Sequence, residues 1–217
     1  MSCLTLTSGI CRGCRDNAGG IKTVYMVNLH DVTAITSALF YQEDGQGQWD
    51  NGSPLDGNGR PITLVDSVTL RTGATWFEFQ PNKYSSSYTE TINSSIENGN
   101  IYYAQVLSLV FGHLKTEIRD VIEELGESEV LVIIENNNGN LFLLGEMKNG
   151  MVVSGGSGAT GTAFGDLNGY TVELTCNAAK PARELCTVTA PSGPALAGDT
   201  LIAGDTTYSA LQQIAQC

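Results

Sequence analysis

The sequence predicts a mainly β fold, an antiparallel β-sandwich or barrel-like domain with one amphipathic α-helix and extended arms. Residues 74–146 alternate between apolar and polar side chains over several short stretches, which is typical of strands. The chain holds 25 glycines and only 16% charged residues, as expected for many strands joined by turns. Its 217 residues, 41% of them hydrophobic, are enough to bury a substantial core.

We divide the chain into three parts. Residues 1–20 are rich in cysteine and glycine, show no hydrophobic period, and are predicted to form an N-terminal arm. Residues 21–190 are predicted to form the β domain. From residue 191 onward the composition changes to Pro, Gly, Ala and Thr with little charge, which indicates a C-terminal arm over 191–217. This arm could include a short strand at 200–203 and a helical end at 208–215.

The first strand is predicted at Ile21–Asn28, where Ile21, Thr23, Tyr25 and Val27 share one face. Strands at 32–41, 62–71 and 75–80 follow. The loop over 42–61 contains five glycines and two prolines, and is longer than a compact domain usually needs. We interpret it as an arm that reaches a neighbouring subunit, with Trp49, Asp50 and Leu55 as its candidate contacts.

A long β-hairpin is predicted over 83–111, with its turn at 97–100 because Asn-Gly supplies the positive φ values of a tight turn. Its second strand is apolar on both faces, whereas a strand with one solvated face should alternate cleanly. Either this strand is central in a two-layer core, or its second face is covered by another subunit. One predicted face holds Ile101, Tyr103, Leu107, Leu109 and Phe111; the other holds Tyr102, Ala104, Val106 and Val110.

An amphipathic helix is predicted over 114–125, with Gly126 as its C-terminal cap residue. Its apolar stripe consists of Leu114, Ile118, Val121, Ile122 and Leu125. A strand–turn–strand unit follows at 130–144, with the asparagine-rich segment 136–140 as its turn. Further strands are predicted at 151–154 and 169–176, separated by a glycine-rich loop over 155–161, and another strand at 184–190.

The sequence offers no convincing catalytic, metal or cofactor site. Residues 156–161 match G-x-G-x-x-G, but a strand rather than a phosphate-binding helix is predicted after them. Cys11 and Cys14 form a C-x-x-C that alone is half of a zinc site or a redox pair, and ordinary cysteines are the simpler interpretation. The two histidines, His30 and His113, lie in no recognisable hydrolase motif. We therefore expect no enzymatic activity, no metal and no cofactor.

The formal net charge of −12 excludes tight duplex binding through a basic face. Such acidity can serve solubility alone, or it can let DNA pass a surface without sticking. No run of about 18 apolar residues is present, so we expect no membrane span, and the N-terminus lacks the features of a secretory signal peptide.

The order of these elements resembles the tail tube (major tail) proteins of tailed bacteriophages. Residues 14–26 (CRDNAGGIKTVYM) look like the glycine-led first strand of phage virion proteins. Phe77–Phe79, residues 88–93 (YTETIN), 97–99 (ENG) and the pair Tyr102 and Tyr103 resemble the long hairpin of that family. Residues 135–146 (ENNNGNLFLLGE) resemble the hairpin that follows the family's helix. The similarity covers residues 14–176.

The resemblance implies a structural virion protein that assembles into stacked, hexameric rings, forming a tube that conducts DNA during ejection. Its partners would be further copies of itself, other tail or neck proteins, and DNA in transient contact, within a virion assembled in the bacterial cytoplasm. The alternative is another virion component, such as a tail terminator, collar or decoration protein. In this interpretation Glu78, Glu90 and Glu97 face the lumen, while Tyr102, Ala104, Val106 and Val110 contact the next subunit.

Overall fold

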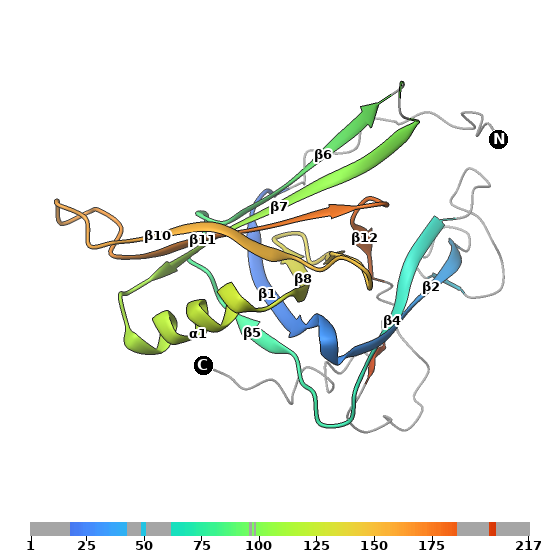
Figure 1. Ribbon diagram of the computed structural model, residues 1–217, viewed down its shortest axis with the longest axis horizontal. Helices are drawn as coiled ribbons and strands as arrows, with labels where there is room; N and C mark the ends of the chain where they lie inside the picture. Colours follow the sequence, from blue (N-terminus) through green and yellow to red (C-terminus); the bar gives the residue numbers. More distant parts are fainter. Residues whose placement is uncertain are drawn as a thin grey trace.

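The described residues form three antiparallel sheets, one α-helix and a short 3-10 helix, η1 (Leu29–Asp31), which confirms the predicted mainly β class (Figure 1). The structure, a computed structural model, describes residues 18–42, 49–50, 62–95, 97, 99–185 and 200–202. The central sheet contains β1 (Ile21–Asn28), β5 (Phe77–Phe79), β8 (Val130–Asn136), β9 (Leu141–Leu144) and β12 (Arg183–Glu184). The hairpin sheet contains β6 (Ser87–Ser95), β7 (Asn100–Gly112), β10 (Val152–Ala159) and β11 (Gly169–Ala178). The third sheet contains β2 (Val32–Gln42), β3 (Trp49–Asp50), β4 (Ile62–Leu70) and β13 (Thr200–Ile202).

The central sheet, in the order β12-β9-β8-β1-β5, is buried on both faces. Successive side chains of a strand point to opposite faces, so Val24 and Met26 enter one core and Tyr25 and Val27 enter the other. The first core lies against the hairpin sheet and the second against the third sheet. This double burial explains why the centre of β1, Val24–Val27, and most of β8, Val130–Ile134, are continuous apolar runs.

The helix α1 (Thr116–Glu127) connects β7 of the hairpin sheet to β8 of the central sheet. Only part of its predicted apolar stripe is covered, because Leu125 is buried and Ile122 packs on the first core while Val121 remains 38% exposed. Gly126 lies inside the helix instead of capping it. The helix ends at Ser128, whose N–H donates to the carbonyl of Leu125 and whose hydroxyl donates to that of Glu124.

The glycine-rich segment predicted as a loop over 155–161 is mostly strand. β10 continues to Ala159 and pairs antiparallel with β11 after a register shift between Val153 and Gly155. A Cβ at Gly156 would lie 2.8 Å from the carbonyl oxygen of Thr171, and one at Gly158 would lie 2.9 Å from the ring of Tyr170. The glycines therefore permit close approach of two strands, and they do not form a phosphate-binding loop.

The predicted arms are only partly described. Within the loop over 42–61, Trp49 and Asp50 form β3 and pair with the end of β2, so this segment is not wholly irregular. In the C-terminal part, β13 pairs with β4, which attaches the predicted arm to the third sheet. The N-terminal arm before residue 18 and the helical end predicted at 208–215 lie outside the described residues.

Candidate association surface

The four residues predicted to contact a neighbouring subunit lie on the outer face of the hairpin sheet. The inner face of β7 enters the first core through Leu107 and Leu109, which are completely buried. Tyr102, Ala104, Val106 and Val110 alternate with that face, and none of them belongs to either buried cluster. Among the described elements no second layer packs on this face, so covering by another subunit remains the prediction for it.

The outer face is polar but almost uncharged. Residues opposite each other in an antiparallel pair share a face, so Thr89 and Thr175 flank Val106 and Thr91 and Asn177 flank Ala104. Glu173 is the charged residue among the outward positions of β6, β7 and β11. Those positions are Ser87, Thr89, Thr91, Asn93, Tyr102, Ala104, Val106, Ser108, Val110, Thr171, Glu173, Thr175 and Asn177.

The hairpin sheet has two edges that no described strand covers. Its order is β10-β11-β7-β6, which places β6 and β10 outermost. Natural edge strands are usually protected by Lys or Pro, by β-bulges, by inward-pointing charges or by a covering segment, because their free N–H and C=O groups pair readily with another strand. The register shift in β10 and the inward Glu90 in β6 are features of this kind. β6 (SYTETINSS) and β10 (VVSGGSGA) contain no Lys, Arg or Pro, and the carboxylate in β6, Glu90, points inward. Helix α1 contacts β10.

The β6–β7 hairpin extends beyond the rest of its sheet (Figure 1). β11 ends at Ala178, opposite Tyr103, so the first residues of β7, from Asn100 to Tyr102, pair with β6 alone. Ile92, Ile101 and Tyr102 in this two-stranded extension are 63%, 56% and 44% exposed. Ile101 shares a face with the buried Leu107 and Leu109, as predicted, but the hairpin carries it past the end of the core.

Glu90 was predicted to line a lumen, and its partly exposed carboxylate is engaged by three groups of its own chain. One carboxylate oxygen accepts hydrogen bonds from the Ala182 N–H at 2.7 Å, the Tyr88 hydroxyl at 2.8 Å and the Gln105 amide at 3.4 Å. Burial and the contact with Glu90 raise the pKa of Tyr88 well above its usual value. Glu90 therefore ties β6 to the segment before β12, and its place along a lumen stays a prediction.

The other two lumen candidates lie on different parts of the fold. Glu78 is on β5, at the edge of the central sheet, where its carboxylate accepts a hydrogen bond from Gln80. Glu97 is exposed at the tip of the β6–β7 hairpin. The structure therefore does not bring the three predicted glutamates together.

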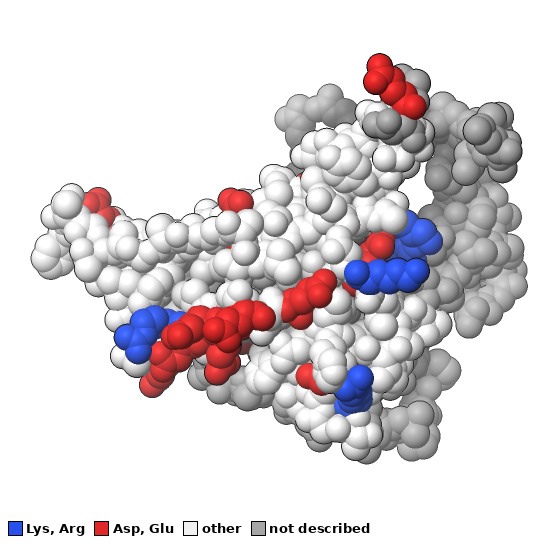
Figure 2. Space-filling view, viewed as in Figure 1, with Lys and Arg blue, Asp and Glu red and all other residues white. Residues whose placement is uncertain are grey.

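Acidic side chains gather instead on helix α1, where Figure 2 shows a nearly continuous red band. Glu117, Asp120, Glu123, Glu124 and Glu127 are all exposed there. Arg119, on the same helix, bonds to Asp120 at 3.0 Å. This acidic face of the helix lies apart from the uncharged face of the hairpin sheet.

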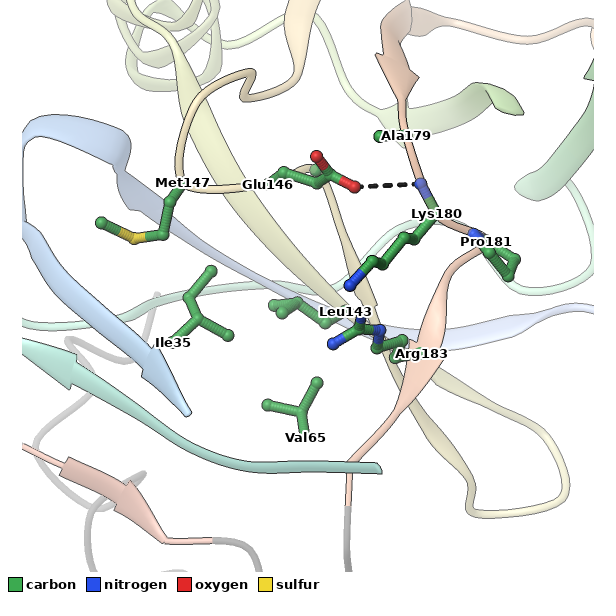
Figure 3. Close-up of a pocket in the computed structure, with 10 residues that line it drawn as sticks. Ile35, Val65, Leu143, Glu146, Met147, Ala179, Lys180, Pro181 and Arg183 are labelled. Atoms are coloured by element: carbon green, nitrogen blue, oxygen red, sulfur yellow. Dashed lines mark hydrogen bonds between the residues drawn. The ribbon is translucent and has the colours of Figure 1, made fainter. Parts of the chain in front are cut away.

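A cavity of about 210 Å³ lies between the central sheet, the third sheet and residues 179–183 (Figure 3). Its apolar lining comes from Ile35, Val65, Leu143, Met147 and Pro181. Lys180, Arg183 and Glu146 add charge, and the Lys180 N–H donates to the Glu146 carboxylate at 3.0 Å. Sequence analysis missed this cavity because its walls come from segments far apart in the chain.

No cluster of three or more His, Cys, Asp or Glu side chains that could hold a metal occurs in the part of the chain that the structure describes. Cys176 is buried, its thiol donates to the Asn149 carbonyl at 3.2 Å, and burial raises its pKa to about 11, so it remains a neutral thiol at neutral pH. The C-x-x-C pair and Leu55 lie outside the described residues. No helix among the described residues is long and apolar enough to span a membrane.

Comparisons with protein-family models, with curated proteins and with solved structures found no match for this chain.

Proposed function

We propose that this chain is a structural subunit that assembles with copies of itself into rings, and that the rings stack into a phage tail tube. The observation that carries the proposal is the hairpin sheet, whose outermost strands β6 and β10 pair with no further strand among the described residues. An edge strand of one copy can add to the other edge of the next copy, with the backbone supplying the hydrogen bonds.

This pairing is of the head-to-tail kind, because it joins two different edges of the same sheet. Such an interface repeats from copy to copy and closes into a ring when the rotation between copies permits. The exposed Ile92, Ile101 and Tyr102 at the hairpin tip would be covered in the assembly, which gives their exposure a reason. The formal charge of −12 suits a conduit from which DNA phosphates are repelled.

The test is mass measurement of the purified chain together with negative-stain imaging. We expect rings and stacks of rings, and a stable monomer at every concentration would overturn the proposal. Single rings that never stack would favour the alternative of a tail terminator or collar protein.

Two substitutions distinguish an edge contact from a face contact. Thr91→Lys places a charged side chain on the edge strand β6 and should prevent ring formation. Val106→Glu places a charge in the centre of the outer face, and it should leave monomers only where that face is itself an interface. Thr72→Lys, in the exposed turn between β4 and β5, is the matched control for added charge and should assemble normally.

A further inference from the structure

A phenylalanine stands fully exposed at the tip of the β10–β11 hairpin. The relative exposure of Phe164 is 113%, the largest among the exposed hydrophobic side chains, and Leu167 beside it is 39% exposed. The hairpin projects at one end of the long axis of the molecule (Figure 1). An apolar ring held in water at a projecting tip gains free energy when a partner covers it.

The loop that carries Phe164 has a fixed shape. One oxygen of Asp166 accepts hydrogen bonds from the Ala163 N–H at 2.7 Å, the Thr162 N–H at 2.8 Å and the Thr162 hydroxyl at 3.1 Å. The Asp166 N–H returns to the Ala163 carbonyl at 3.1 Å, and Gly161 supplies a φ of +70° at the start of the turn. Because the turn is already ordered, docking of Phe164 would cost little conformational entropy.

The cavity in Figure 3 is large enough for this tip, and two of the three charged residues that line it are cationic. Its volume of about 210 Å³ exceeds the roughly 150 Å³ that is known to accept a benzene ring. Leu143, Val65 and Pro181 give it apolar walls. Lys180 and Arg183 also line it, and the third charged residue, Glu146, accepts a hydrogen bond from the Lys180 N–H. Asp166 in the Phe164 loop is opposite in charge to Lys180 and Arg183, and its pKa is lowered by the Ala163 and Thr162 N–H groups.

The tip and the cavity lie toward opposite ends of the long axis, because β12, β4 and β2 are on the far side of the molecule from the projecting loop (Figure 1). A tip cannot reach the cavity of its own chain. It can reach the cavity of a second copy placed along this axis, which runs with the strands of the hairpin sheet. Edge pairing of β6 with β10 instead extends across those strands.

We infer that Phe164 of one copy inserts into the Leu143–Lys180 cavity of another copy and forms the contact between stacked rings. The inference rests on the proposed function and assigns a contact to the stacking step alone. In this contact the Phe164 ring fills the apolar part of the cavity. Lys180 and Arg183 lie opposite the carboxylate of Asp166 in the loop.

The experiment compares the full-length chain with Phe164→Ala by sedimentation velocity and negative-stain imaging. Phe164→Ala should form rings but raise the concentration needed for stacking by about tenfold or more, as expected for removal of a buried aromatic anchor. Its thermal midpoint should be unchanged, because the side chain touches nothing in the single chain. Tyr84→Asn is the matched control: Tyr84 is an 88% exposed aromatic residue in the turn before β6, and asparagine tolerates its φ of 62°.

A charge exchange tests the cavity directly. Lys180→Glu should weaken stacking, and Gly165→Lys on the tip should restore it, because a Cβ at Gly165 meets no atom within 4 Å. Native tubes with equally good stacking by Phe164→Ala would overturn this inference and leave the proposed function intact. A native chain that forms neither rings nor tubes would overturn both.

Discussion

The carboxylate of Glu90 is only partly exposed, and its partners lie both near to it and far from it in the chain. Glu90 lies on the same face of β6 as Tyr88 and Ile92. The sequence does not reveal that a segment ninety-two residues away supplies an N–H for its carboxylate. Gln105 is a similar case: its amide is buried at 1% exposure and bonds to Gly145 and Glu90, in a strand whose other inward-facing residues are apolar.

Replacement of Glu90 by alanine should destabilise the single chain rather than change its surface. The Ala182 N–H and the Tyr88 hydroxyl would lose their acceptor, which costs about 1–3 kcal/mol for each partly buried group left unpaired. The measurement is the free energy of unfolding from urea titrations. Glu97→Ala at the exposed hairpin tip is the control, and its free energy of unfolding should stay within about 0.5 kcal/mol of the native value. Equal, small effects at both positions would show that Glu90 is not held as described.

At the scale of elements, the strands follow from local pattern, while their lengths depend on partners. The bounds of β1 agree with the prediction. Side chains on both of its faces are buried from Thr23 to Val27, and the strand ends at the exposed Asn28. β10 was predicted to end at Ser154, since glycine disfavours strands, yet it continues to Ala159 because β11 provides a full set of pairing partners. Helix α1 was recognisable from its apolar period, but its incomplete burial could not be predicted from that period.

Gly169 lies where β11 passes close to β7, and its missing side chain permits this close approach. A Cβ at Gly169 would lie 2.0 Å from the backbone oxygen of Phe111, so β7 and β11 would have to separate. Gly169→Ala should therefore lower the free energy of unfolding by about 1–3 kcal/mol or more. Gly155→Ala in the neighbouring strand meets nothing within 4 Å and is the matched control, expected to be neutral or slightly stabilising. Thermal unfolding of the two variants side by side measures the difference, and a neutral Gly169→Ala would contradict this register.

At the scale of the whole molecule, the sheets differ in how much of their surface is buried. The central sheet contributes side chains from both of its faces to the two hydrophobic cores, and these cores hold the three sheets together. The hairpin sheet keeps one face and two edges open among the described residues, and the acidic residues of α1 lie elsewhere. Composition predicted the acidic surface, but only the tertiary arrangement separates it from the uncharged face on which association is proposed.

This separation predicts how salt should act on assembly. Each copy carries a formal charge of −12, so copies repel one another at long range, while backbone pairing at β6 and β10 is short-ranged and largely uncharged. The screening length falls from about 30 Å at 0.01 M salt to about 8 Å at 0.15 M. Ring formation, followed by sedimentation velocity at fixed protein concentration, should therefore increase over this range. Rings that dissociate as salt rises would show that attraction between charges holds the copies together, and edge pairing would then not be the dominant contact.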